Sequence, residues 1–174
     1  IKAYLDENGF TYLKLKDNEL PEKIADLISQ EKVIGWFQGR MEFGPRALGS
    51  RTIIGDARSP ETQKVINLKI KYRESFRPFA PSILEEYVSE YFDIDISSPY
   101  MLMVTKIKKP DLIPAVTHID GTGRLQTVSK EGNPLYYDLI QKFFDLTNVP
   151  VVINTSMNVK GEPIVNTPEQ AYNM

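Results

Sequence analysis

Short apolar runs interleave with amphipathic helical patterns, and this order constrains the fold more than any other feature of the sequence. The run VIGWF, residues 33–37, is nearly all apolar and favours a strand buried on both faces. Strands are expected at residues 10–15, 33–37, 52–58, 79–84, 100–107, 125–128 and 149–156, and helices at residues 21–32, 59–72, 85–92 and 133–147. Because the two types do not alternate strictly, the sequence predicts a single α/β (α+β-like) domain with a twisted mixed sheet flanked by helices.

The helix starts are marked by recognisable capping residues. Ser59 precedes Pro60, and Thr167 precedes Pro168, so that each pair places an N-cap before a proline in the first turn. In the helix at residues 133–147, the residues expected to share the buried face are Leu135, Leu139, Phe143 and Leu146. The chain starts at Ile1 and stops seven residues after Thr167, so we expect a domain of a longer protein.

The composition excludes several classes of function. A net charge of −2 and a pI near 5.5 argue against bulk electrostatic attraction to nucleic acid or to an acidic membrane. There is no cysteine and only one histidine, His118, so that disulfides, thiolate sites and a site of several histidines within the chain are excluded. No stretch suits a membrane span or a signal peptide, and a cytoplasmic protein without a metal site of its own is expected.

A glycine-rich loop, residues 39–51 (GRMEFGPRALGSR), carries Arg40, Arg46 and Arg51 together with Glu42. Glycines permit positive φ angles and close approach of backbone N–H groups to an anion, and guanidinium groups bind phosphate bidentately. Glu42 could orient one arginine through an ion pair. A solvated turn explains the same composition equally well, so the loop alone leaves both interpretations open.

Two further segments carry cations. Residues 69–77 hold Lys69, Lys71, Arg73 and Arg77; the dipole at the end of a helix explains Lys69, whereas Arg77 lies in an apolar loop where burial requires a partner. Residues 117–127 (THIDGTGRLQT) hold a turn signal followed by Arg124. In isolation, His118 is better explained as an ordinary hydrogen-bonding residue.

A fourth segment, residues 153–163 (INTSMNVKGEP), places Asn154, Ser156 and Asn158 at the end of a probable buried strand, where α/β sheets often hold ligands. These four segments together supply several cationic donors and short polar groups, which suits a ligand with phosphate and a planar amide-like head. The Walker-type phosphate loop is absent, and GTGRLQ lacks the third glycine of a dinucleotide fingerprint.

GWFQGRMEFGPRALGSR, KYRESFRPFAP, HIDGTGRLQTV and NTSMNVKGEPIV resemble, in order, the C-terminal domain of the O-carbamoyltransferases, including the nodulation and antibiotic carbamoyltransferases. The resemblance covers about residues 12–174 and implies a YrdC-like domain over residues 21–174, after a linker and first strand at residues 1–20. Lys71-Tyr72-Arg73 and Ser156-Met157-Asn158 match the K-x-R and S-x-N signatures of such domains. Ser50 and Gly123 depart from the family pattern, where asparagine and alanine are expected.

The resemblance implies that the domain binds carbamoyl phosphate and ATP, with Mg²⁺ expected beside ATP, and forms a carbamoyl-adenylate. A separate N-terminal domain of the Kae1/ASKHA type, bearing a transition metal, would pass the carbamoyl group to a hydroxyl of a small-molecule or sugar acceptor. Catalytic roles fall to Lys71, Arg73, His118 and Arg124. Binding roles fall to the other predicted positions, which are Arg40, Glu42, Arg46, Arg51, Arg77, Asn154, Ser156 and Asn158.

Two other functions compete with this one. YrdC-type domains that recognise RNA suggest a binding module, although the net acidity speaks against it. A non-catalytic interface domain that only supports its partner domain is the third interpretation. The expected partners are carbamoyl phosphate, ATP and the protein's own N-terminal domain, with a homodimer as a further expectation and with neither membrane nor nucleic acid.

Overall fold

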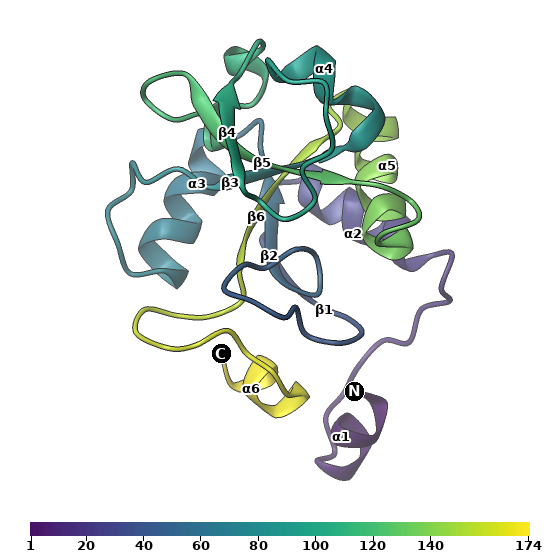
Figure 1. The fold of residues 1–174 in the computed structure, drawn as a ribbon. Helices are drawn as coiled ribbons and strands as arrows, with labels where there is room; N and C mark the ends of the chain where they lie inside the picture. The colour runs from purple at the N-terminus through teal and green to yellow at the C-terminus, as the bar shows by residue number, and fades with distance from the viewer.

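The computed structural model describes residues 1–174 and contains one six-stranded mixed sheet (Figure 1). The strands are β1 Ile34–Phe37, β2 Arg51–Asp56, β3 Ala80–Leu84, β4 Met103–Lys106, β5 Thr122–Val128 and β6 Val151–Ser156. Their order across the sheet is β1-β2-β6-β3-β5-β4. Only β3 and β5 run parallel, and all other neighbours are antiparallel, which confirms the predicted mixed sheet.

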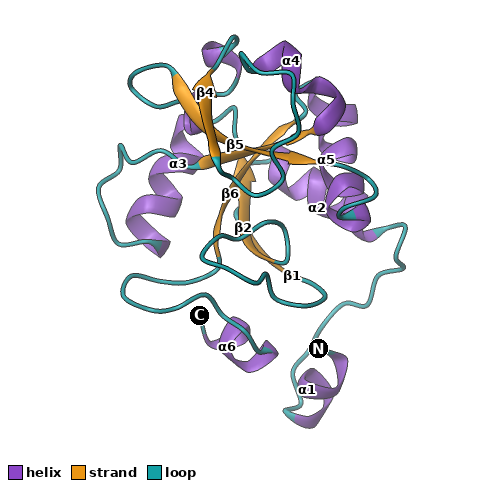
Figure 2. Ribbon diagram, in the orientation of Figure 1, coloured by secondary structure: helices purple, strands orange, loops and turns teal.

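Helices cover both faces of this sheet (Figure 2). The α-helices are α1 Lys2–Glu7, α2 Leu20–Ser29, α3 Pro60–Val65, α4 Val88–Tyr91, α5 Pro134–Thr147 and α6 Pro168–Asn173. A π-helical turn, Ile66–Ile70, continues α3, and three short 3₁₀ turns span Glu85–Tyr87, Pro110–Leu112 and Pro114–Val116. No helix has the length and apolar character needed to cross a membrane.

The hydrophobic core consists of two layers, one on each face of the sheet. Successive strand residues point to opposite faces, so Ile53 joins one layer and Ile54 the other. α2 and α5 lie side by side over the face that holds Ile54 (Figure 1). The π-helical turn, α4 and the 3₁₀ turns cover the opposite face. The central strands β2 and β3 are buried along their whole length, because the two layers cover both of their faces.

The predicted helix caps are present. The Ser59 side chain accepts a hydrogen bond from the backbone N–H of Thr62 at 3.2 Å. Thr167 forms a capping box with Gln170, in which the Thr167 hydroxyl accepts from the Gln170 N–H and the Gln170 side chain accepts from the Thr167 N–H. These local signals fixed the starts of α3 and α6.

The N-terminal segment differs from the prediction. Residues 10–15 form no strand, and a helix that was not predicted, α1, lies before them. The segment packs against α6 instead of the sheet, because Phe10 stacks on Tyr172 with ring centroids 3.9 Å apart and Tyr4 contacts both rings. The alternating apolar residues at 10–15 therefore do not mark a strand, and Phe10 packs against aromatic rings outside the sheet.

Three details of the other elements also differ. β1 is an edge strand and is only partly buried, because no strand pairs with its outer side. The buried face of α5 contains Tyr136 and Ile140, whereas the predicted Leu146 is 55% exposed, because α5 turns its face toward α2. Arg124 lies on β5, since this strand starts at Thr122 rather than at residue 125.

Candidate functional site

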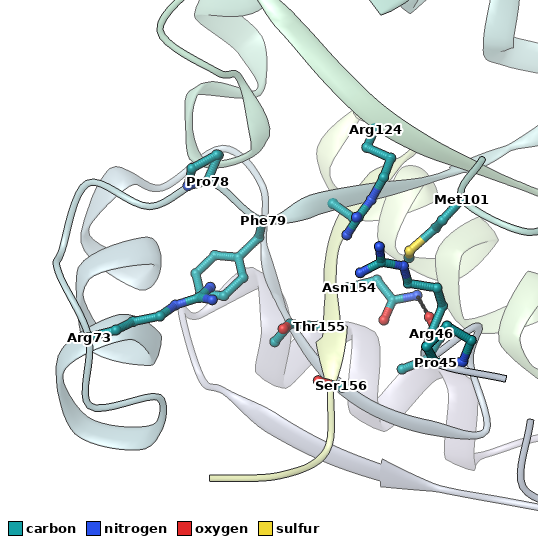
Figure 3. Close-up of a pocket in the computed structure, with 12 residues that line it drawn as sticks. Pro45, Arg46, Arg73, Pro78, Phe79, Met101, Arg124, Asn154, Thr155 and Ser156 are labelled. Atoms are coloured by element: carbon teal, nitrogen blue, oxygen red, sulfur yellow. Dashed lines mark hydrogen bonds between the residues drawn. The ribbon is translucent and has the colours of Figure 1, made fainter. Parts of the chain in front are cut away.

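The mixed topology brings residues that are distant in the sequence to the same end of the central strands. Ala80, at the start of β3, pairs with Asn154 near the end of the antiparallel β6. β5 runs parallel to β3, so its first residues, including Arg124, come to the same end. A cavity of about 170 Å³ opens there. It is lined by Pro45, Arg46, Ala47, Arg73, Pro78, Phe79, Ala80, Met101, Arg124, Asn154, Thr155 and Ser156 (Figure 3). We call it the inner pocket.

Three arginines from three different segments reach the inner pocket. Arg46 comes from the loop between β1 and β2, Arg124 from β5 and Arg73 from the loop after the π-helical turn. Figure 3 shows the Arg46 and Arg124 guanidinium groups beside each other above Asn154. The Arg73 guanidinium lies over the Phe79 ring, 4.9 Å from its centroid. A small cavity with three cationic walls suits an anion.

A second cavity, of about 270 Å³, adjoins the first and shares Arg73, Thr155 and Ser156 with it. We call it the outer pocket. Its remaining lining residues are Lys71, Arg77, Asn158, Val159, Lys160 and Gly161. Arg77 is exposed and lies 3.9 Å from Glu74, a weak surface ion pair. The two pockets together form one continuous cationic surface around the end of β6.

Lys71 joins the two predicted signatures into one cluster. Its ammonium donates to the backbone oxygens of Ser156 and Asn158 and, at 2.8 Å, to Asn158 Oδ1. The Ser156 hydroxyl donates to the same Asn158 oxygen at 2.7 Å. Burial, and secondarily the Arg73 charge, lower the pKa of Lys71 to about 8, so the group titrates close to neutral pH.

Arg73 is positioned by Asn67, a fully buried residue of the π-helical turn. The Arg73 Nε donates to Asn67 Oδ1 at 2.6 Å, while the Asn67 amide donates to the carbonyls of Ser75 and Arg77 at 3.1 and 2.8 Å. Tyr72 stands in the left-handed region, with φ of 45°, between the two cations. π-helical turns and such backbone outliers gather at functional sites, and here both precede Arg73 directly.

Except for Arg77, the cations of the two pockets lack carboxylate partners at close range. None of the ion pairs in the structure involves Arg46, Lys71, Arg73 or Arg124. Burial lowers the pKa of Arg73, with Arg77 adding to the effect, and burial lowers the pKa of Arg124, with Arg46 adding to it. Crowded, partly desolvated cations without counter-charges are expected to attract an anionic ligand.

Arg51 and Glu42 lie outside the inner pocket and brace the glycine-rich loop. The Arg51 guanidinium donates to four backbone carbonyls, those of Gln38, Gly39, Ser50 and Asn166, and lies 3.5 Å from the centroid of the Phe37 ring. One oxygen of Glu42 accepts from the backbone N–H groups of Leu48, Ser50 and Arg51 at 2.7–3.2 Å. The geometry gives both residues structural contacts within the loop.

Arg40 and His118 are also not brought to either pocket. Arg40 is exposed in the loop between β1 and β2 and lines neither cavity. His118 Nδ1 lies 3.2 Å from the Thr122 hydroxyl, in the tight turn that precedes β5. This turn fixes the start of β5 and hence of Arg124. The remaining predicted residues all line one or both pockets.

The sequence reasoning missed several residues of the site. Asn67 lies within the apolar pattern VINLKI, where a buried amide is itself a signal. Lys160 belongs to the fourth segment, where its residue type alone indicated no role of its own, and it lines the outer pocket. Met101 lines the inner pocket in the left-handed region, with φ of 55°, which nothing in its sequence context indicates.

The structure defines a class of fold that is known from solved proteins. The crystal structure of full-length HypF in its phosphate- and nucleotide-bound form matches with a TM-score of 0.62 at 21% identity, over 88% of this chain and 19% of HypF. The HypF of T. kodakarensis matches with a TM-score of 0.58 at 19% identity, over 87% of this chain and 19% of that protein. The chain therefore shares the fold of a part of HypF, and the predicted α/β domain with a mixed sheet flanked by helices is confirmed.

Sequence comparison identifies the family. Residues 25–174 match the family described as Carbamoyltransferase C-terminus, and the chain belongs to it. The uncharacterized protein sll1178 of Synechocystis is 51% identical over 97% of this chain and 33% of its own length. Nodulation protein NolO of Bradyrhizobium diazoefficiens is 45% identical over 90% of this chain and 29% of its own length. The chain thus spans about a third or less of these relatives.

Proposed function

We propose that this carbamoyltransferase-family domain binds carbamoyl phosphate and ATP and supports the formation of a carbamoyl-adenylate. The observation that carries the proposal is the cluster of Arg46, Lys71, Arg73 and Arg124, which lacks close carboxylates, around two adjoining cavities. Two cavities suit two phosphate-bearing ligands. The phosphate- and nucleotide-bound form of HypF, which shares the fold, supports the same class of ligand.

The proposed reaction consumes one water. Water attacks the phosphorus of carbamoyl phosphate. The bond between this phosphorus and the carbamoyl oxygen breaks, and phosphate and carbamate are the products. The carbamate oxygen then attacks the α-phosphorus of ATP and displaces pyrophosphate, which leaves a carbamoyl-adenylate. A hydroxyl of the acceptor finally takes the carbamoyl group and releases AMP; we assign this step, and the choice of acceptor, to an N-terminal domain with its own metal.

The residues of the pockets would act mainly through position and charge. Arg46, Arg73 and Arg124 would hold the phosphate of carbamoyl phosphate in the inner pocket, and Arg77 and Lys160 would hold the phosphates of ATP in the outer one. Lys71, whose three N–H groups donate to protein oxygens, would attract these phosphates through its charge. Ser156 and Arg73 line both pockets and would lie between the reactants. Mg²⁺ is expected to accompany ATP, but no group of three or more His, Cys, Asp or Glu side chains gathers in the structure, so no residue is assigned to it.

The test is a calorimetric titration of the full-length protein with carbamoyl phosphate and with ATP. We expect Arg73→Ala and Arg124→Ala to weaken carbamoyl phosphate binding by roughly 10- to 100-fold, because each removes a charge-assisted contact. Lys69→Ala is the matched control, since it removes an exposed charge two residues from Lys71 that lines neither pocket. The proposal fails if the unmodified protein binds neither ligand, or if Arg73→Ala leaves binding and carbamoyl transfer intact.

A further inference from the structure

Asn154 holds a buried hydrogen-bond acceptor that has no partner in the protein. The residue is 1% exposed, lies on β6 and lines the inner pocket, yet its Oδ1 atom makes no hydrogen bond. Buried polar atoms are almost always paired, and an unpaired one costs free energy. The cavity beside it is the place from which a partner would come.

The orientation of the Asn154 amide is fixed by backbone carbonyls. The Gln126 Nε2 donates to the Leu48 carbonyl at 2.9 Å, which leaves Gln126 Oε1 facing Asn154. The Asn154 Nδ2 donates to this oxygen at 2.8 Å and to the Ala47 carbonyl at 3.0 Å. Carbonyl oxygens only accept hydrogen bonds, so a flipped amide would place oxygen against oxygen. Nδ2 therefore faces the Gln126 and Ala47 oxygens, and Oδ1 is left for the pocket.

The hydroxyl of Ser82 completes this network from β3. It donates to Gln126 Oε1 at 2.7 Å and lies 3.1 Å from Asn154 Nδ2. Three strands, β3, β5 and β6, and the glycine-rich loop thus hold one amide in place. Such a rigid support is what a group needs in order to discriminate between ligands.

The charged walls of the inner pocket are donors. Arg124 Nε is buried without a partner, and Arg46 and Arg73 bring further N–H groups. An acceptor surrounded by donors complements a group that carries both an N–H and several oxygens. The carbamoyl group of carbamoyl phosphate, H₂N–C(=O)–O–, has this combination: its amine would donate to Asn154 Oδ1, and its oxygens would accept from the guanidinium groups.

We infer that Asn154 is the specificity-determining residue that selects a carbamoyl group over acyl groups without an N–H, through its unpaired Oδ1 in the inner pocket. The inference rests on the proposed function. Acetyl phosphate is the decisive comparison, because a methyl group of similar size replaces the amine and cannot donate. Binding it would leave Asn154 Oδ1 buried and unpaired.

The test compares the binding of carbamoyl phosphate and acetyl phosphate to the full-length protein by calorimetry. The unmodified protein is expected to prefer carbamoyl phosphate by roughly 10- to 100-fold. Asn154→Ala should bring this ratio close to one, chiefly by weakening carbamoyl phosphate. Lys69→Ala is the control: it removes an exposed charge that lines neither pocket and touches no part of the Asn154 network, so the ratio should stay as it is in the unmodified protein.

Each outcome separates the inference from the proposed function. If carbamoyl phosphate binds but the unmodified protein does not prefer it, or if Asn154→Ala keeps the preference, the inference is wrong while the proposed function stands. If neither phosphate binds, the proposed function fails and the inference with it. The adenine amine is the other available donor: if Asn154→Ala abolishes a preference for ATP over ITP and leaves the carbamoyl ratio unchanged, Asn154 reads the nucleotide and the inference is overturned.

Discussion

Arg51 and Arg73 have the same side chain and opposite surroundings. Arg51, at the start of β2, is 4% exposed and donates to four backbone carbonyls. Arg73 uses one nitrogen to hold on to Asn67 and presents the rest of its guanidinium to two cavities. In the first case the protein supplies four oxygens to the cation, and in the second case it supplies one and leaves the other N–H groups open to the cavities.

Under the proposed function, the number of protein acceptors around an arginine should separate support from binding better than its position in a motif does. The glycine-rich loop contains both kinds, since Arg46 lines the inner pocket and Arg51 braces the loop. Substitutions on the support side should therefore change stability first, and substitutions on the pocket side should change affinity first.

The largest effect is expected from Arg51→Met. The substitution leaves four carbonyls without their donor in a nearly buried site, which should lower the free energy of unfolding by about 3 kcal/mol or more. Chemical denaturation of both proteins measures it. Arg51→Lys should recover only part of the loss, because a single ammonium cannot reproduce the guanidinium fork.

Arg73→Met provides the opposite half of the comparison. It should change the free energy of unfolding by less than Arg51→Met does, while it weakens ligand binding. Equal destabilisation by the two substitutions would show that the acceptor count does not distinguish them.

A smaller effect on stability is expected from Glu42→Ala. The carboxylate oxygen that accepts three backbone N–H groups is lost, at a cost of about 2 kcal/mol, and Arg46 loses part of the loop that positions it. Glu42→Gln keeps an oxygen in the same place and should retain most of the stability. If Glu42→Gln is as unstable as Glu42→Ala, the charge, and not the acceptor geometry, braces the loop.

The smallest effect is a pH dependence of affinity that comes from Lys71. Because its pKa is about 8, the ammonium is lost between pH 7 and pH 9, and the affinity for a phosphate ligand should fall by up to about tenfold. Lys71→Met should abolish this decline, and Lys69→Met should keep it. Calorimetric titrations at pH 7, 8 and 9 provide the measurement.

The same group has the opposite effect on stability. The unfolded chain keeps the proton of Lys71 up to the ordinary value of 10.5, so between pH 8 and 10.5 the unfolded state binds more protons. The contribution of Lys71 to the free energy of unfolding therefore rises with pH in this window, while affinity falls. Parallel changes of both quantities would contradict the assignment.

Much of the fold followed from local sequence. Short apolar runs predicted buried strands such as β2 and β6, and a single capping residue predicted the start of helix α3. The segment at residues 10–15 was predicted wrongly because its aromatic partner, Tyr172, lies at the other end of the chain. Pairings over such a distance leave no trace in local periodicity.

The site was predictable to a similar degree. Polar and cationic residues after apolar runs indicated Arg46, Arg73, Arg124 and Ser156 as candidates, and the structure brings them together. Arg51 was predicted to bind the ligand with them, but it donates to four backbone carbonyls instead. Contacts to the backbone cannot be read from residue types alone. The roles of the pocket residues remain predictions until ligand binding is measured.

The place of β6 in the sheet has a consequence for the order in which the molecule assembles. The last strand of the chain lies between β2 and β3, so that the hairpin of β1 and β2 has no strand contact with β3, β5 and β4 until it arrives. Long-range pairing of this kind is slow to form. Until β6 joins the sheet, Arg46 and Arg124 belong to two parts without strand contact, so the inner pocket forms only after this late pairing.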